Sequence, residues 1–163
     1  IITDRDLNRD GPWTGWQPFR PKSGVFSVLM PARPEVEQDT VQVRTGSISL
    51  VVTRLIYRAR QGDSGALASV SYAEFPLDYV RSHGSDLWSQ FQSEPREPGD
   101  TDTMISGKLG GHPAMILQGH RKQTYGCLVG GRFFELVLVM PPDEPLPRDE
   151  VHPFFESFRV LSE

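Results

Sequence analysis

Four histidines are the side chains of this 163-residue chain best suited to holding a metal ion or moving a proton. They are His83, His112, His120 and His152. No two of them have a tight ligand spacing such as H-x-x-x-H. His112 and His120 fall on one expected strand, where eight extended residues separate them by about 26 Å. We therefore predict structural or surface histidines, no metal site and no cofactor.

The acidic side chains cluster only in segments that we expect to be loops or helix ends. Asp100 and Asp102 could offer two oxygens to a cation, but no EF-hand-like spacing accompanies them. Asp149 is a candidate N-cap of a terminal helix, where negative charge is favoured. We expect solvated loops and a capped helix rather than a pair of catalytic carboxylates.

The segment Gly62-Asp63-Ser64-Gly65 matches the nucleophile signature of chymotrypsin-like serine proteases. In that family the catalytic histidine and aspartate precede the serine in the chain. Here no histidine precedes His83, so the base is missing. The same four residues are also typical of a turn between two strands. We interpret them as a turn and predict no catalytic residues and no enzymatic activity.

The net charge of −4 conceals a segregation of charge along the chain. Residues 40–62 hold four arginines and no acid, and residues 103–134 hold four basic residues and no acid. The segments that follow each of them are mainly acidic. The overall acidity argues against general nucleic-acid binding. Two hypotheses remain for the basic segments. The segments are ordinary solvated strand ends whose charges form internal ion pairs, or they form a surface that binds an anionic partner.

If these segments bind a protein partner, the candidate contacts are basic residues of the expected hairpins and two aromatics that we expect to cap an edge of the core and to be exposed there. They are Arg54, Arg58, Arg60, Arg121, Lys122, Trp13 and Trp16. The single cysteine, Cys127, excludes an internal disulfide and sits in a strand-like run, where burial is expected.

Two long segments, 48–57 and 133–140, carry apolar side chains at even and odd positions alike. A strand with one wet face alternates, so this pattern indicates strands covered on both faces. Other expected strands cover residues 25–30, 36–44, 67–74, 104–109, 113–119 and 125–129. We expect hairpins around Gly110-Gly111 and Gly130-Gly131, because two-glycine connections tolerate the positive φ angles of tight turns. A helix broken near Gly84 is expected within 77–93, and a short one near 151–155. We predict the α+β class, with an antiparallel sheet sandwiched between helices.

A chain of this length is expected to form one domain. Residues 1–24 are polar, rich in Gly and Pro and without periodicity, and Ile1 is no natural start. We predict an extended segment or tether remnant over 1–24 and a single domain over 25–163. No run approaches the ~20 apolar residues of a membrane-spanning helix.

The order of several short motifs resembles that of PsbP-like proteins of bacteria, over roughly residues 16–161. The motifs are Phe26 to Pro31 followed by Pro34, Val70-Ser71-Tyr72 leading to Pro76, Gly111-His112-Pro113-Ala114, and Phe154 to Val160. The resemblance implies an antiparallel sheet between helices, an α/β/α sandwich. It also implies a protein that binds and stabilises partners, is generally not an enzyme, and often belongs to the bacterial envelope.

The sequence and the resemblance together predict a non-enzymatic accessory domain. We expect a peripheral, extracytoplasmic subunit of a bacterial membrane-associated assembly, in the periplasm or envelope, held by a missing N-terminal segment. Two alternatives remain open: a carrier of a small lipid or glycan in the envelope, and a cytosolic chaperone-like adaptor.

Overall fold

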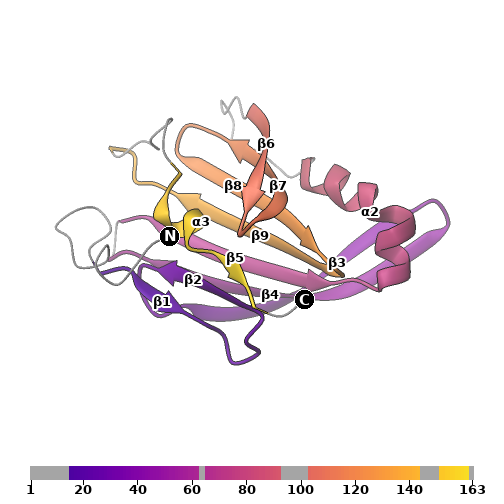
Figure 1. Ribbon diagram of the computed structural model, residues 1–163, viewed down its shortest axis with the longest axis horizontal. Coiled ribbons are helices and arrows are strands. Elements are labelled where there is room, and N and C mark those ends of the chain that lie inside the picture. The colour runs from indigo at the N-terminus through magenta and orange to yellow at the C-terminus, as the bar shows by residue number, and fades with distance from the viewer. Residues whose placement is uncertain (1–14, 63–64, 93–102, 144–150, 162–163) are drawn as a thin grey trace.

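The computed structural model describes residues 15–62, 65–92, 103–143 and 151–161, and this part of the chain is mostly β-structure. Its larger sheet has seven strands in the order β3-β4-β5-β9-β8-β7-β6, and every neighbouring pair is antiparallel (Figure 1). The strands are β3 (Glu35–Thr45), β4 (Ile48–Arg60), β5 (Leu67–Glu74), β6 (Thr103–Leu109), β7 (His112–Gln118), β8 (Lys122–Val129) and β9 (Arg132–Val139).

A smaller antiparallel sheet joins the two ends of the described chain, in the order β1-β2-β10. Its strands are β1 (Gln17–Phe19), β2 (Phe26–Met30) and β10 (Arg159–Val160). The described residues contain two helices, α2 (Leu77–Gln92) and α3 (Pro153–Glu156). The backbone of α2 is kinked at His83, next to the expected break at Gly84.

Tight glycine turns set the register of the larger sheet. Gly110 and Gly111, between β6 and β7, both have positive φ angles, of 58° and 85°. A two-residue turn of this kind matches the twist of the strands it joins, and glycine adopts it without steric cost. Gly131 serves another purpose, since a Cβ there would lie 2.5 Å from the Phe75 carbonyl oxygen. Strands β6 and β7 pair around Gly110 and Gly111, and β8 and β9 pair around Gly130 and Gly131, so both predicted hairpins are confirmed.

The two faces of the seven-stranded sheet are covered differently. Val70 and Leu136 are register partners on what we call the inner face, which packs against the small sheet and α3. Ser71 and Glu135 are the next partners and project from the opposite, outer face. Only one end of the outer face has a described cover, where α2 packs Tyr79 and Leu87 over a second apolar cluster.

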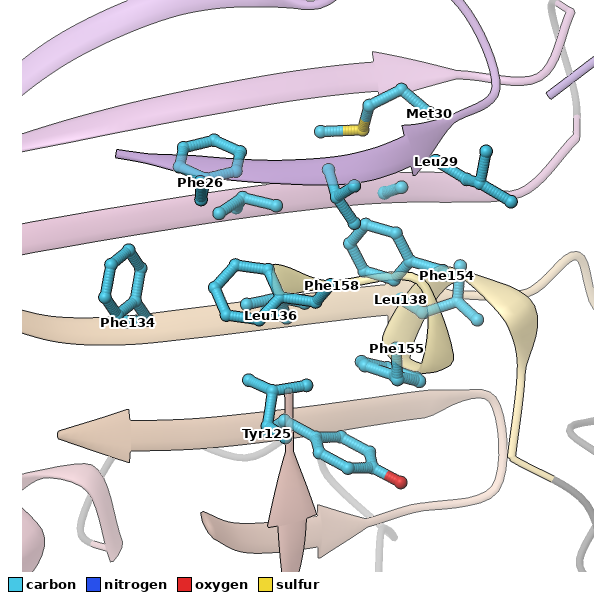
Figure 2. Packing of buried hydrophobic residues seen from close by; sticks show 14 of the residues in the cluster. Phe26, Leu29, Met30, Tyr125, Phe134, Leu136, Leu138, Phe154, Phe155 and Phe158 are labelled. Atoms are coloured by element: carbon cyan, nitrogen blue, oxygen red, sulfur yellow. The ribbon is translucent and has the colours of Figure 1, made fainter. Parts of the chain in front are cut away.

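Aromatic rings fill the space between the two sheets. Phe26 of β2, Phe134 of β9 and Phe158 beside α3 are fully buried, and their ring centroids lie 5.3 to 6.4 Å apart (Figure 2). Tyr125 and Phe155 stack at 4.1 Å. Offset and edge-to-face pairs of this kind bury large apolar area and hold the two sheets in one arrangement.

The expected α+β class, with an α/β/α sandwich, is wrong, because the described chain is mostly β-structure with two antiparallel sheets. The inner face is covered by a second sheet, and α3 is a single turn of four residues. Among the described residues, the outer face has one helix over one end rather than a layer of helices. Apolar residues on both faces of a strand require cover, but the pattern does not say whether a helix or a sheet supplies it. Val36, on the edge strand β3, and Val51 on β4 are 58% and 60% exposed.

Trp16, which we expected at the surface, is buried, with 2% of its area exposed. Its ring packs against His152 and Phe154 at centroid distances of 5.2 and 6.2 Å. Strand β1 follows it directly and pairs with β2. The described fold thus includes part of the segment that we expected to be an extended tether, and Trp16 offers a partner almost no surface.

Candidate functional site

Three arginines surround a pocket on the outer face, near the ends of β4 and β5. The pocket has a volume of about 490 Å³ and is lined by Arg33, Glu35, Arg58, Ala59, Arg60 and Leu67. Arg58 and Arg60 are two residues apart on β4, so both side chains project from the same face. Glu35 is the register partner of Arg58, and Leu67 that of Arg60. We call this site the arginine pocket.

The arginine pocket carries an excess of positive charge. Arg58 donates from Nη1 to both carboxylate oxygens of Glu37 at 3.3 Å, a long contact between exposed groups. Within the described ranges, Arg33 and Arg60 form no ion pair. Three guanidinium groups against Glu35 and Glu37 leave one net positive charge. The site is therefore suited to an anionic group, in a chain whose net charge is −4.

Arg54 lies on the same face but is already neutralised. Its Nε and Nη2 donate to the two carboxylate oxygens of Asp39 at 2.9 and 2.6 Å. The hydrogen bond from Arg54 lowers the pKa of Asp39, as does the nearby positive charge. A guanidinium group that already donates two hydrogen bonds to one carboxylate has less capacity to bind a further anion. Arg54 is therefore the weakest of the predicted basic contacts on β4.

Lys122 projects from the same outer face, three strands away. Lys122 on β8 pairs with Val139 on β9, Val139 pairs with Leu67 on β5, and Leu67 pairs with Arg60 on β4. These register pairings place all four side chains on the same face. Arg121 precedes this strand and donates from Nε to the Met140 carbonyl oxygen at 3.1 Å. The structure thus brings Arg58, Arg60 and Lys122 onto one face, while Arg121 is partly used to hold the neighbouring backbone.

The hydroxyl, imidazole and carboxyl groups nearest one another lie elsewhere, where the tip of the β3–β4 hairpin meets α2. Thr45 Oγ1 donates to Asp86 Oδ2 at 3.0 Å and lies 3.1 Å from the Tyr79 hydroxyl. His83 Nδ1 is 3.8 Å from the same Asp86 oxygen. No hydrogen bond among the described residues joins the imidazole to a hydroxyl, so no nucleophile is paired with a base there. The contacts fasten the hairpin to the helix.

Cys127 and His152 are both buried and serve the core. Burial raises the pKa of the Cys127 thiol to about 11, which keeps it protonated and unreactive at neutral pH. Burial also lowers the pKa of His152 to about 3. The neutral imidazole accepts the Phe154 N–H at Nδ1, at 3.0 Å, and so caps α3. Asp149, the expected cap, lies outside the described residues.

No group of three or more His, Cys, Asp or Glu side chains arranged to hold a metal ion occurs in the part of the chain that the structure describes. The described helices include none with the length and apolar character needed to cross a bilayer. Ser64, Trp13, Asp100 and Asp102 lie outside the described residues, so their predicted roles stay predictions.

We found no match between this chain and the models of known protein families, and none among curated proteins. The resemblance to PsbP-like proteins therefore stays a prediction based on short motifs.

Sequence reasoning missed Arg33. It lies between Pro31 and Pro34 in the connection that leads into β3, outside both basic segments. Its role depends on the fold, which places this connection beside the end of β4. The only signal in the sequence was a lone basic residue held in an extended segment by Pro34.

Proposed function

We propose that this chain is a non-enzymatic binding domain that recognises an acidic protein partner through the arginine pocket. The observation that carries this proposal is the convergence of Arg33, Arg58 and Arg60 on one pocket in a chain that is acidic as a whole. Arginine presents a planar set of donors that matches a carboxylate, and it loses less hydration than lysine on binding.

The charge balance supports a protein carboxylate over a nucleic acid. After Glu35 and Glu37 are counted, the pocket keeps one net positive charge, enough for one carboxylate. Nucleic-acid sites need a broad basic stripe that neutralises several phosphates. The apolar side chain of Leu67 in the same lining adds a surface for the uncharged part of a peptide.

Titration with fluorescently labelled poly-L-glutamate tests the proposal. Binding should weaken as salt is added, because exposed charges are screened within about 8 Å at physiological ionic strength. The double variant Arg33→Gln/Arg60→Gln should weaken binding by about fivefold or more. The matched control, Arg44→Gln/Arg81→Gln, removes the same charge from two exposed sites outside the pocket and should leave binding unchanged. Equal losses in the two double variants would contradict a role for the pocket.

A place in a bacterial membrane-associated assembly, on the extracytoplasmic side, is a further part of the proposal. Its support is the set of short motifs shared with PsbP-like proteins. Purification from detergent-solubilised membranes of the source cells should recover the protein with a stoichiometric partner that is released by the Arg33→Gln/Arg60→Gln change. Recovery of the wild-type protein as a free monomer would count against this part.

A further inference from the structure

Four side chains form a straight row across the outer face, one from each of four neighbouring strands. The row runs from Arg60 on β4 through Leu67 on β5 and Val139 on β9 to Lys122 on β8. Each is the direct register partner of the next, so all four project from the same face. The row is basic at both ends and apolar between them.

The length of this row follows from the spacing of strands. Neighbouring strands lie about 4.8 Å apart, so three spacings place the Arg60 and Lys122 backbones about 14 Å from each other. Arg60 is exposed, and Leu67, Val139 and Lys122 are partly exposed. Neither Arg60 nor Lys122 forms an ion pair with another described residue. Both charges can therefore meet an incoming ligand.

An extended peptide has a matching period. Its side chains at positions i, i+2 and i+4 share one face, and four residues at about 3.4 Å span about 14 Å. Acidic residues at i and i+4 would meet Arg60 and Lys122, while an apolar residue at i+2 would lie between Leu67 and Val139. We infer that the row binds an extended partner segment with the pattern acidic-x-apolar-x-acidic, running across the strands of the outer face.

This inference rests on the proposed function and narrows it to one kind of segment. Charge complementarity at both ends and the apolar centre together distinguish this occupant from a general polyanion. A single small carboxylate would engage only one end of the row. A segment that bridges both ends gains two charge contacts and one apolar contact from a single ordered strand.

The test compares synthetic seven-residue peptides with blocked ends, using chemical-shift titration of the 15N-labelled protein. The probe is acetyl-Thr-Glu-Thr-Leu-Thr-Glu-Thr-amide. One control peptide replaces its leucine with serine, and another moves the second glutamate one position earlier. We expect the probe to bind at least about fivefold more tightly than either control, because each control removes one well-placed contact.

Protein variants locate the site. Arg60→Gln and Lys122→Gln should each weaken probe binding by about two- to fivefold, as expected for the loss of one exposed charge contact. Arg44→Gln is the matched control, because Arg44 is exposed on β3 and belongs to the opposite face by register. Its affinity for the probe should equal that of the wild type.

The outcomes separate the two proposals. If the three peptides bind equally and Arg33→Gln/Arg60→Gln still weakens poly-glutamate binding by about fivefold or more, the pocket binds acids but the row is wrong. If no acidic peptide or polymer binds, both proposals fail. Equal competition by glutarate, or self-association that Arg60→Gln abolishes, would place a small diacid or a second copy on this face and overturn the inference.

Discussion

Arg60 on β4 and Leu67 on β5 are register partners, so a charged and an apolar side chain stand side by side on the outer face. Both line the arginine pocket, and Leu67 continues into the row that ends at Lys122. This pair of residues therefore offers a ligand both a charged contact, from Arg60, and an apolar contact, from Leu67. It also places a cation where the described residues offer it no ion pair, an arrangement that serves binding better than stability.

The first prediction concerns the stability of the arginine variants. Arg60→Gln should leave the free energy of unfolding within about 0.5 kcal/mol of wild type, because no described ion pair is lost. Arg54→Gln breaks the two hydrogen bonds to Asp39 and should cost up to about 1 kcal/mol. Urea denaturation followed by circular dichroism measures both. A larger loss in Arg60→Gln would give Arg60 a structural role.

The second prediction concerns acid stability. The folded protein keeps His152 neutral down to a pKa of about 3, whereas in the unfolded chain the imidazole takes up a proton near its ordinary pKa of 6.5. The unfolded state thus binds more protons between these values, and the contribution of His152 is complete above pH 6.5. It is lost as the pH falls toward 3, by at most about 1.4 kcal/mol per pH unit.

Replacing His152 isolates this contribution from that of the carboxyl groups. His152→Asn keeps an acceptor in place of Nδ1 for the Phe154 N–H but does not titrate. The free energy of unfolding of this variant should fall less steeply than that of wild type between pH 6.5 and 4. Parallel curves in urea titrations over this range would show that His152 is not buried as a neutral imidazole.

The third prediction concerns the link between the two ends of the chain. Ser157 Oγ accepts the Leu29 N–H at 2.8 Å and donates to the Phe154 carbonyl oxygen at 3.0 Å. Ser157→Ala leaves the Leu29 N–H without this acceptor and should cost about 1 to 3 kcal/mol. Ser89→Ala removes an exposed hydroxyl within α2 and should cost less than about 0.5 kcal/mol. Equal costs in thermal unfolding would refute the role of Ser157.

The fourth prediction compares two glycines with different surroundings. A Cβ at Gly131 would collide with the Phe75 backbone, so Gly131→Ala should destabilise the protein by about 1 to 3 kcal/mol. A Cβ at Gly84 would meet Leu128 and Val80 at an ordinary 3.9 Å. Gly84→Ala should therefore be neutral or stabilise α2 by up to about 1 kcal/mol. The opposite order of melting temperatures would contradict the close approach at Gly131.

Hairpins and strand positions could be predicted from the sequence because their signals are local. Strand β5 begins and ends at the predicted residues, and the glycine pairs mark two turns. The covering layer could not be predicted. Strands of three and two residues, such as β1 and β10, are too short for any periodicity to be read. Each of them pairs with β2, whose residues belong to the core.

The candidate site was only partly visible in the sequence for a similar reason. Charge segregation identified Arg58, Arg60 and Lys122 as candidates, but register alone places Lys122 on the same face as the arginines. Arg33 joins them through the path of the chain between β2 and β3. Trp16 shows the opposite error, since an aromatic residue near glycine and proline was taken as exposed although it completes the core.

The most direct test of the account is a map of where an acidic polypeptide contacts the protein. Titration of the 15N-labelled protein with poly-L-glutamate should shift the amide signals of residues 33, 35, 58–60, 67, 122 and 139, with a single saturable midpoint that rises with salt. Signals of Arg44 and Val51, on the uncovered inner side of the hairpin, should not move. Shifts centred on Arg44 and Val51, or no saturable shift at the arginine pocket, would contradict the account.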